Sequence, residues 1–160
     1  MKYLNYSPLK GFNSFSKVFS ISKKFRNEQL LIGICYKPTD ILIKGKAPDQ
    51  NKIYVGISVP KKYFKKAVIR NRIKRLIKET FRAYIKDTNK IDELSKVQII
   101  TINWYGNSID KVKDIKLHDV RTPIFKMLDK ILHINEKNST EVNNTQVNNT
   151  EFVNSIENAK

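Results

Sequence analysis

Residues 61–82, KKYFKKAVIRNRIKRLIKETFR, combine ten Lys or Arg side chains with a single acidic residue, Glu79. No Gly or Pro occurs from 61 to 104, so nothing interrupts a helix that begins near Lys66 and ends near Lys86. At 100° per residue, an apolar face separates from a cationic one. The segment therefore predicts a long helix that packs one face on its own protein and presents the other to an anionic partner.

The two faces of this predicted helix differ in chemistry. The apolar face is expected to consist of Ile69, Ile73, Leu76, Thr80 and Tyr84, with Ile77 at its edge. The cationic face is expected to consist of Arg70, Lys74, Lys78 and Arg82, extended by Asn71 and Arg75, with Arg72 on the far side of the apolar face. Ordinary solvated helices balance such a face with acids four residues away, and here Arg75–Glu79 is the single such pair.

The positive charge of the chain is concentrated around this helix. Residues 52–90 hold 13 Lys or Arg against two acids, so they supply +11 of the formal net charge of +16. Nucleic acid, a membrane surface and an acidic protein are all anionic partners for such a patch, and a solvated face without a ligand is the plain alternative. A nucleic acid is favoured, because its phosphates repeat and a ladder of cations neutralises several at once.

The apolar runs of the sequence are short. No apolar run approaches the roughly 18–20 residues that span a bilayer, and the N-terminal MKYLNYSPLKGFNSF lacks the apolar core of a signal peptide. The one cysteine, Cys35, lies in an apolar run and predicts a buried structural thiol. We expect a cytoplasmic protein with no membrane partner and no obligate protein partner.

Strand and helix patterns flank the basic helix. We expect a short helix over 14–20, strands over 29–36, 53–59 and 97–103, a loop over 37–51 with a small hairpin arm around 41–44, and a last helix over at least 124–134. This order predicts an α+β sandwich of one sheet and packed helices in a single domain, residues 1–135. The Asn- and Thr-rich segment 136–160 predicts a disordered tail.

Two aromatic residues, Phe15 and Phe19, lie four positions apart on the short helix. Such spacing is ordinarily core packing. The functional alternative is a stacking platform for unpaired bases, and Lys17, Lys23 and Lys24 lie nearby to meet phosphates.

A catalytic constellation is not visible in the sequence. His118 and His133 are too few and too isolated for a metal site, and Cys35 has no evident partner. There is no phosphate-binding Gly loop and no carboxylate pair in the basic region. The chain therefore predicts a binding protein, with no catalytic residue and no metal ligand.

The run VGISVPKK at 55–62, followed by Ala67 and by RNRIKRLIKE at 70–79, resembles the signature of the bacterial ribonuclease P protein component. LKGF at 9–12 with FSKVF at 15–19 resembles the first helix of that family. The resemblance covers about residues 7–134. It implies a single α-β-β-β-α-β-α sandwich of the ribosomal protein S5 domain 2-like type, with a left-handed βαβ crossover against the right-handed norm.

The resemblance also implies a function. The family's protein joins a large catalytic RNA and promotes endonucleolytic removal of the 5′ leader from precursor tRNA, which generates the mature 5′ end. The RNA performs the Mg²⁺-dependent hydrolysis, so the endoribonuclease activity belongs to the ribonucleoprotein. Mapped onto this chain, the RNA-binding residues are Lys61, Lys62, Arg70, Asn71, Arg72, Lys74, Arg75 and Lys78. Phe15 and Phe19 match the aromatics of the family's leader-binding cleft.

The chain departs from the family pattern at three places. The turn after the lysine pair lacks the Gly that many members have, and Lys78 stands where Arg is often seen. Some members carry an aromatic residue on the first long strand, and this chain has no clear match for it around Gly33. Two hypotheses compete with the ribonuclease P subunit. One is a non-enzymatic RNA-binding module such as a ribosomal protein. The other is a DNA regulator with a basic helix, for which the sequence offers no dimer seam.

Overall fold

The computed structural model describes residues 4–37, 39–87, 91–106 and 115–133. Two compact units divide the chain, Met1–Met127 and Leu128–Lys160, and the sheet belongs to the first. The predicted disordered tail, 136–160, lies outside the described residues, so the tail and the domain boundary at 135 stay predictions. No helix in the described ranges has the length and apolar character needed to cross a bilayer.

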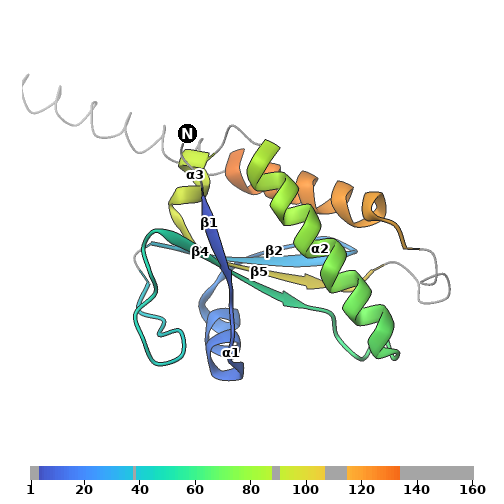
Figure 1. The fold of residues 1–160 in the computed structure, drawn as a ribbon, viewed down its shortest axis with the longest axis horizontal. Helices are drawn as coiled ribbons and strands as arrows, with labels where there is room; N and C mark the ends of the chain where they lie inside the picture. The colour runs from blue at the N-terminus through green and yellow to red at the C-terminus, as the bar shows by residue number, and fades with distance from the viewer. Residues whose placement is uncertain (1–3, 38, 88–90, 107–114, 134–160) are drawn as a thin grey trace, which may run out of the picture. The chain divides into compact units, whose positions relative to one another are not determined.

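A five-stranded mixed sheet forms the centre of the first unit (Figure 1). Its strands are β1 (Asn5–Pro8), β2 (Lys23–Arg26), β3 (Leu30–Tyr36), β4 (Lys52–Ser58) and β5 (Val97–Trp104), in the order β1-β4-β5-β3-β2. β4 pairs in parallel with β1 and β5, whereas β3 pairs antiparallel with β2 and β5. Every residue of the central strand β5 is buried, including the polar Gln98, Thr101 and Asn103 among its apolar residues.

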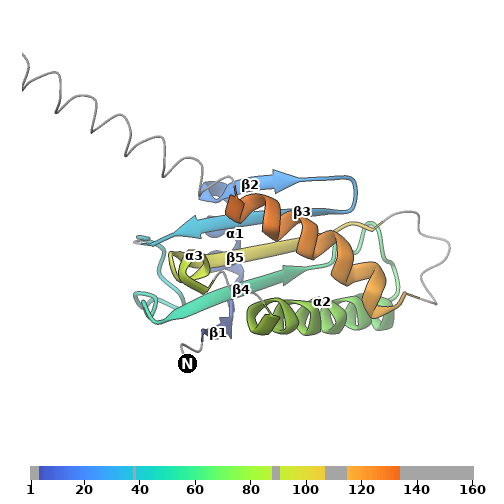
Figure 2. The ribbon, with the colours of Figure 1, turned by 90° about the horizontal axis from the view of Figure 1, so that it is seen from above.

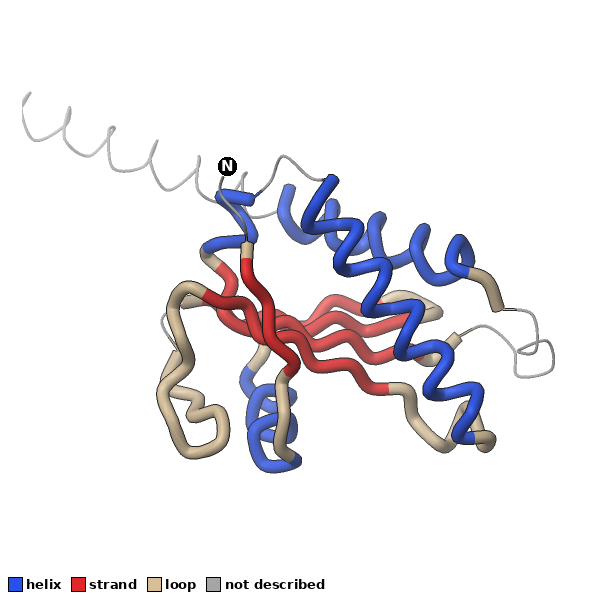
Figure 3. Tube along the Cα trace, viewed as in Figure 1, coloured by secondary structure: helices blue, strands red, loops and turns tan. Residues whose placement is uncertain are grey.

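Two helices cover opposite faces of this sheet: α1 (Phe12–Ile21) on one and α2 (Ala67–Asp87) on the other (Figures 1 and 3). Val18 of α1 is fully buried in a cluster with Cys35, Ile41 and Ile99. A short helix, α3 (Ile91–Ser95), leads into β5, and residues 117–133 form the last helix. The sheet is therefore buried on both sides, and the two helices at its faces offer different surfaces to solvent.

The connection from β4 through α2 to β5 is a left-handed crossover. Figure 2 views the sheet from the side that α2 covers, with β4 and the parallel β5 both running to the right and β5 above β4. A chain that leaves β4, passes over this near face and returns in β5 turns in the left-handed sense, against the usual preference. The crossover places α2 beside β4 and β1, at the β1 edge of the sheet.

Most predicted elements are confirmed, with shifts of one to two residues at the ends of the first helix, the basic helix and the three strands. The last helix begins at 117, before Pro123, because Lys116 and Asp119 exchange hydrogen bonds at its start (2.8 and 3.2 Å). β1 and α3 were not predicted as elements, and β2 was implied only by the family resemblance, which calls for three strands between the first helix and the basic helix. β1 and β2 are four-residue strands at the sheet edges, where most side chains stay exposed, so their sequences carry little apolar signal. The arm predicted around 41–44 is a single bridge, Ile43–Lys46, closed by Gly45 at φ 76°.

The buried face of α2 includes the predicted Ile73, Thr80 and Tyr84 but differs from the prediction at other positions. Ile77 lies fully buried at its centre rather than at its edge, and Phe81, one turn later, is 1% exposed. Leu76, expected on this face, is half-buried. The buried side of the helix therefore follows the i, i+4 row of residues 73, 77 and 81, together with the neighbouring Thr80 and Tyr84.

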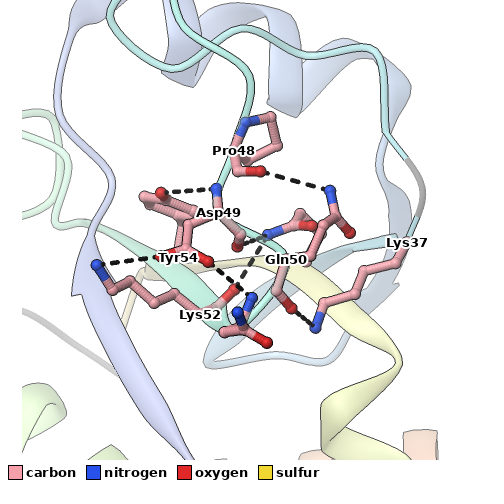
Figure 4. A network of polar contacts seen from close by, with 8 residues as sticks. Lys37, Pro48, Asp49, Gln50, Lys52 and Tyr54 are labelled. Carbon is pink, nitrogen blue, oxygen red and sulfur yellow. Dashed lines mark hydrogen bonds and ion pairs between the residues drawn. The ribbon is translucent and has the colours of Figure 1, made fainter.

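The loop over 37–51 is tied at its end to the central strand (Figure 4). Gln98 of β5, fully buried, donates from Nε2 to the carbonyl oxygens of Asp49 and Lys52, both at 3.0 Å. The Lys37 ammonium donates to the Gln50 carbonyl, and the Asp49 carboxylate meets the Lys52 ammonium at 3.3 Å. These bonds hold the entry to β4 in register with β5.

Cys35 is buried, as predicted, and burial raises the pKa of its thiol. Because the thiolate is the reactive form, we expect the native protein to react with a thiol reagent at neutral pH much more slowly than the denatured chain does. Absorbance-monitored labelling with and without denaturant measures both rates. Equal rates would contradict the buried position.

Candidate nucleic-acid interface

A lysine-rich turn joins β4 to the basic helix. Phe64 is 5% exposed and anchors this turn, and the amides of Tyr63 and Phe64 both donate to the Pro60 carbonyl at 3.2 Å. The anchored ring leaves Lys61 and Lys62 exposed on the outside of the turn. A buried aromatic residue thus holds the predicted lysine pair in place.

Arg70 fastens this turn to the first turn of α2. Its Nη1 donates to the carbonyl oxygens of Phe64 and Lys65, at 2.8 and 2.7 Å. The residue is half-buried. One nitrogen of the guanidinium is therefore occupied by the protein, which gives this predicted RNA-binding residue a positioning role as well.

The remaining predicted residues of α2 lie on its accessible surface. Asn71, Arg75 and Lys78 are exposed and Lys74 is half-buried. Exposed Arg72 donates from Nη2 to the Ile115 carbonyl at 3.1 Å, so it ties α2 to the segment before the last helix. The acid Glu79 lies 4.0 Å from Arg82, with both side chains about 60% exposed. This weak, exposed pair leaves the basic surface largely uncompensated.

The two aromatics predicted to bind a leader lie on the other side of the sheet. Phe15 is half-buried above Gly56 of β4, where an added Cβ would come within 2.7 Å of its Cε2 atom. Phe19 is 37% exposed, and the Lys24 ammonium lies 4.7 Å from its ring centroid. Phe15 therefore packs against the sheet and stays partly accessible, whereas the more exposed ring of Phe19 lies beside a cation.

The structure does not bring all predicted residues into one site. It groups the lysine turn with the cations of α2, whereas Phe15 and Phe19 belong to α1, and Figure 1 shows these two helices on opposite faces of the sheet. A nucleic acid that touches both groups has to pass around the end or edge of the sheet, or two different strands have to bind. The arrangement suits a protein that meets two RNA segments at once.

One aromatic cluster was missed at the level of sequence. Tyr63 and Tyr105 meet edge to face, with ring centroids 5.4 Å apart. The guanidinium carbon of Arg26 lies 5.6 Å from the Tyr105 centroid, and the Lys62 ammonium lies 5.8 Å from the Tyr63 centroid. Half-buried aromatics with exposed cations are typical of nucleic-acid surfaces. The four residues are spread from position 26 to position 105, so no local pattern joins them.

Replacing Arg70 by Ala is expected to lower the free energy of unfolding by about 1–2 kcal/mol. Two charge-assisted hydrogen bonds are lost, and their value is reduced because the residue is only half-buried. The matched change Arg75→Ala removes an exposed arginine from the same helix and is expected to cost less than about 0.5 kcal/mol. Urea denaturation compares the two variants. Equal stabilities would show that Arg70 does not fasten the turn.

Both the sequence and the fold of this chain are similar to those of known proteins. The protein-family model described as Ribonuclease P matches residues 5–105. The ribonuclease P protein component of Rickettsia bellii is 34% identical over 98 residues, which cover 61% of this chain and 75% of that protein. The ribonuclease P protein component of Rickettsia canadensis is 31% identical over 97 residues, which cover 61% of this chain and 78% of that protein.

The fold also matches a solved structure. The Staphylococcus aureus RNase P protein superposes with a TM-score of 0.54 at 21% identity, over 82% of this chain and 96% of that one. At this sequence identity the structural similarity shows only that the two proteins share a fold, one mixed sheet with helices. The family assignment rests on the Rickettsia relatives and on the matched family model, whose residues 5–105 include β4, the lysine turn and the basic helix described above. The chain belongs to the ribonuclease P protein component family, whose function is the processing of tRNA 5′ leaders.

Proposed function

We propose that this chain binds the catalytic RNA subunit with the α2 face and the Lys61–Lys62 turn, and binds the single-stranded 5′ leader of precursor tRNA with the α1 face. The observation that carries the proposal is the division of the surface by the sheet. Uncompensated cations lie on the α2 side, and an accessible aromatic with a neighbouring lysine lies on the α1 side. Folded RNA offers clustered phosphates, whereas a single strand offers unstacked bases.

The α2 face suits a structured RNA because its cations stand on a rigid support. Ile73 and Ile77 are fully buried beneath the helix. The exposed side chains of Asn71, Arg75 and Lys78 are therefore held at fixed spacing along the helix. Each phosphate that such a cation neutralises releases a counterion, so affinity should fall steeply with salt.

The α1 face suits an unpaired strand. The Phe19 ring is accessible for stacking on a base, and the Lys24 ammonium beside it is placed to meet the adjacent phosphate. Phe15 supports this surface from the sheet side, over Gly56. The leader of a precursor tRNA is the single-stranded RNA that this family's reaction supplies.

We also propose that the Mg²⁺ of the reaction is held by the RNA. Within residues 4–37, 39–87, 91–106 and 115–133, no group of three or more His, Cys, Asp or Glu side chains is arranged to hold a metal ion. The donor set of these residues does not fit a divalent-cation site. The chain's own contribution is then to position the two RNAs and to offset their mutual repulsion. We place this work in the cytoplasm, where the substrate is made.

Reconstitution with a bacterial ribonuclease P RNA at low Mg²⁺ tests the proposal. We expect the full chain to stimulate cleavage of precursor tRNA, because the basic surface replaces cations that the RNA otherwise requires. The affinity of the complex for precursor should exceed that for mature tRNA. Absence of stimulation would contradict the proposed subunit role. If the chain stimulates cleavage but the complex binds precursor and mature tRNA equally well, the assignment of the leader to the α1 face is contradicted.

Phe19→Ala is expected to weaken binding of leader-bearing precursor by about 1–3 kcal/mol, the usual cost of losing one base–aromatic stack, with little change in stability. Phe15→Ala is expected to reduce both precursor binding and stability, because that ring also packs on the sheet. Ile21→Ala, a change at an exposed residue of α1, is the matched control. Titrations of the complex with tRNA that carries or lacks the leader, together with thermal melts, distinguish the three variants. If Phe15→Ala lowers only the melting temperature, Phe15 is a core residue.

A further inference from the structure

A cavity lies between the edge of the sheet and α2. It has a volume of about 270 Å³, opens to solvent and is lined by residues of β1, β4 and α2. Its apolar lining comes from Pro8, Val55, Ile57 and Phe81. Tyr6, Lys78 and Arg82 complete the wall. The cavity thus combines an apolar wall with two cations, and none of its lining residues is acidic.

The polar side of this cavity is held by contacts within the protein. Nε of Arg82 donates to the Tyr6 hydroxyl at 2.6 Å, across 76 positions of sequence. The Tyr6 ring in turn meets Phe81 edge to face, with centroids 5.6 Å apart. These contacts orient the guanidinium through Nε, and the side chain as a whole is 58% exposed, so a ligand can reach its other donors. Glu79, 4.0 Å from Arg82, forms an exposed pair that does not neutralise the site.

The size and chemistry of the cavity define its ligand. Pockets for drug-sized ligands occupy about 300–1,000 Å³, so this slightly smaller space suits one planar group. An apolar wall with an aromatic side chain accepts the face of a nucleobase, and a lysine beside an oriented arginine accepts the adjoining phosphate. An unpaired nucleotide is the single unit that carries both features.

We propose that this cavity binds one unpaired nucleotide of the catalytic RNA subunit, with the base beside Tyr6 and the phosphate on Lys78 and Arg82. The inference rests on the proposed function of the α2 face. The RNA subunit is the source, because Lys78 and Arg82 continue the cationic row of α2 from Lys74. The leader is assigned to the opposite face, with α1. Tyr6, Pro8 and Arg82 become RNA-binding residues that the family signature does not include.

The affinity of the full chain for the RNA subunit tests this site. Tyr6→Ala is expected to weaken binding roughly 5- to 150-fold, as the loss of one stacked base does. The slope of log affinity against log salt should stay unchanged, because no charge is removed. Lys86→Ala is the matched control. It removes an exposed cation of α2 outside the cavity, so it should alter the slope by no more than about one unit and weaken binding less than Tyr6→Ala.

A crosslinking experiment covers the case in which Tyr6→Ala loses stability. Pro8 is exposed at the cavity, so Pro8→Cys in a Cys35→Ser background gives one labelling site for a photoreactive group. We expect a crosslink to a single-stranded nucleotide of the RNA subunit in the complex. The matched site is Glu28→Cys, at the exposed β2–β3 turn. A crosslink no stronger than at that site, or one to the leader alone, would overturn the proposal.

The outcomes separate this inference from the proposed function. If the unchanged chain fails to bind the RNA subunit, the proposed function fails first. If the unchanged chain binds and a folded Tyr6→Ala variant binds equally well, the cavity is not a nucleotide site and the proposed function stands. If Tyr6→Ala reduces only leader discrimination, the occupant is the leader and the assignment to the RNA subunit is wrong.

Discussion

Replacing Ile73 by Ala is expected to lower the free energy of unfolding by about 2–5 kcal/mol. Ile73 is fully buried between α2 and the sheet, so the change removes apolar contacts and leaves a cavity. For a domain of this size, such a loss is a large share of the total stability. Urea denaturation with an unchanged m-value would measure it.

Val68 supplies a control on the same helix. It is 81% exposed, so Val68→Ala removes two methyl groups that contact mainly water, and its expected effect is within about 0.5 kcal/mol. If the basic surface depends on the buried support of α2, Ile73→Ala should also weaken RNA binding at temperatures near its lowered melting point. Val68→Ala should not. Equal stabilities of the two variants would show that α2 is not anchored at Ile73.

Gly56→Ala is expected to cost about 1–3 kcal/mol of stability and to reduce leader discrimination. An added Cβ would lie 2.7 Å from Cε2 of Phe15 and 3.1 Å from Cδ2 of Leu9, closer than packed atoms tolerate. The ring of Phe15 must move away from the sheet, which disturbs the face proposed to hold the leader. Thermal melts and binding of precursor with and without its leader measure the two effects.

A double-mutant cycle makes this prediction specific. If the clash with Phe15 is the cause, Gly56→Ala should cost much less when Phe15 is already Ala, with a coupling energy of about 0.5–3 kcal/mol. Gly33→Ala is the matched control. Its added Cβ would meet Ser22 and Thr101, both at 2.6 Å, so Phe15→Ala should give it no relief. Additive effects of Gly56→Ala and Phe15→Ala would contradict the contact between them.

Local patterns in the sequence were sufficient for the long elements. β5 is rich in β-branched apolar residues because both of its faces are buried, and α2 lacks Gly and Pro and repeats apolar residues at helical spacing. Local patterns did not reveal the short edge strands, because these are stabilised by pairing with a neighbour rather than by burying their own side chains. β1, for instance, pairs with β4 in the register Tyr6–Ile53 and Pro8–Val55.

The individual roles of the site residues depended on distant partners. Arg70 and Arg75 look alike in the sequence, yet Arg70 bonds to carbonyl oxygens five and six positions before it, whereas Arg75 lies exposed. Phe15 and Phe19 share a helix face in the sequence, yet the sheet half-buries one and leaves the other more accessible. Helical spacing alone does not tell which of two equivalent side chains the rest of the fold covers.

The sequence by itself determined that a basic amphipathic helix lies between two buried strands, and its signature pointed to the ribonuclease P protein family. Periodicity and charge are local properties, so they can be read from the sequence without knowledge of the fold. Only the tertiary structure decided that the cations and the aromatics lie on opposite faces of the sheet, and that Tyr6 meets Arg82 beside a cavity. The order of strands in the sheet brings these residues together, and that order results from the packing of the whole chain.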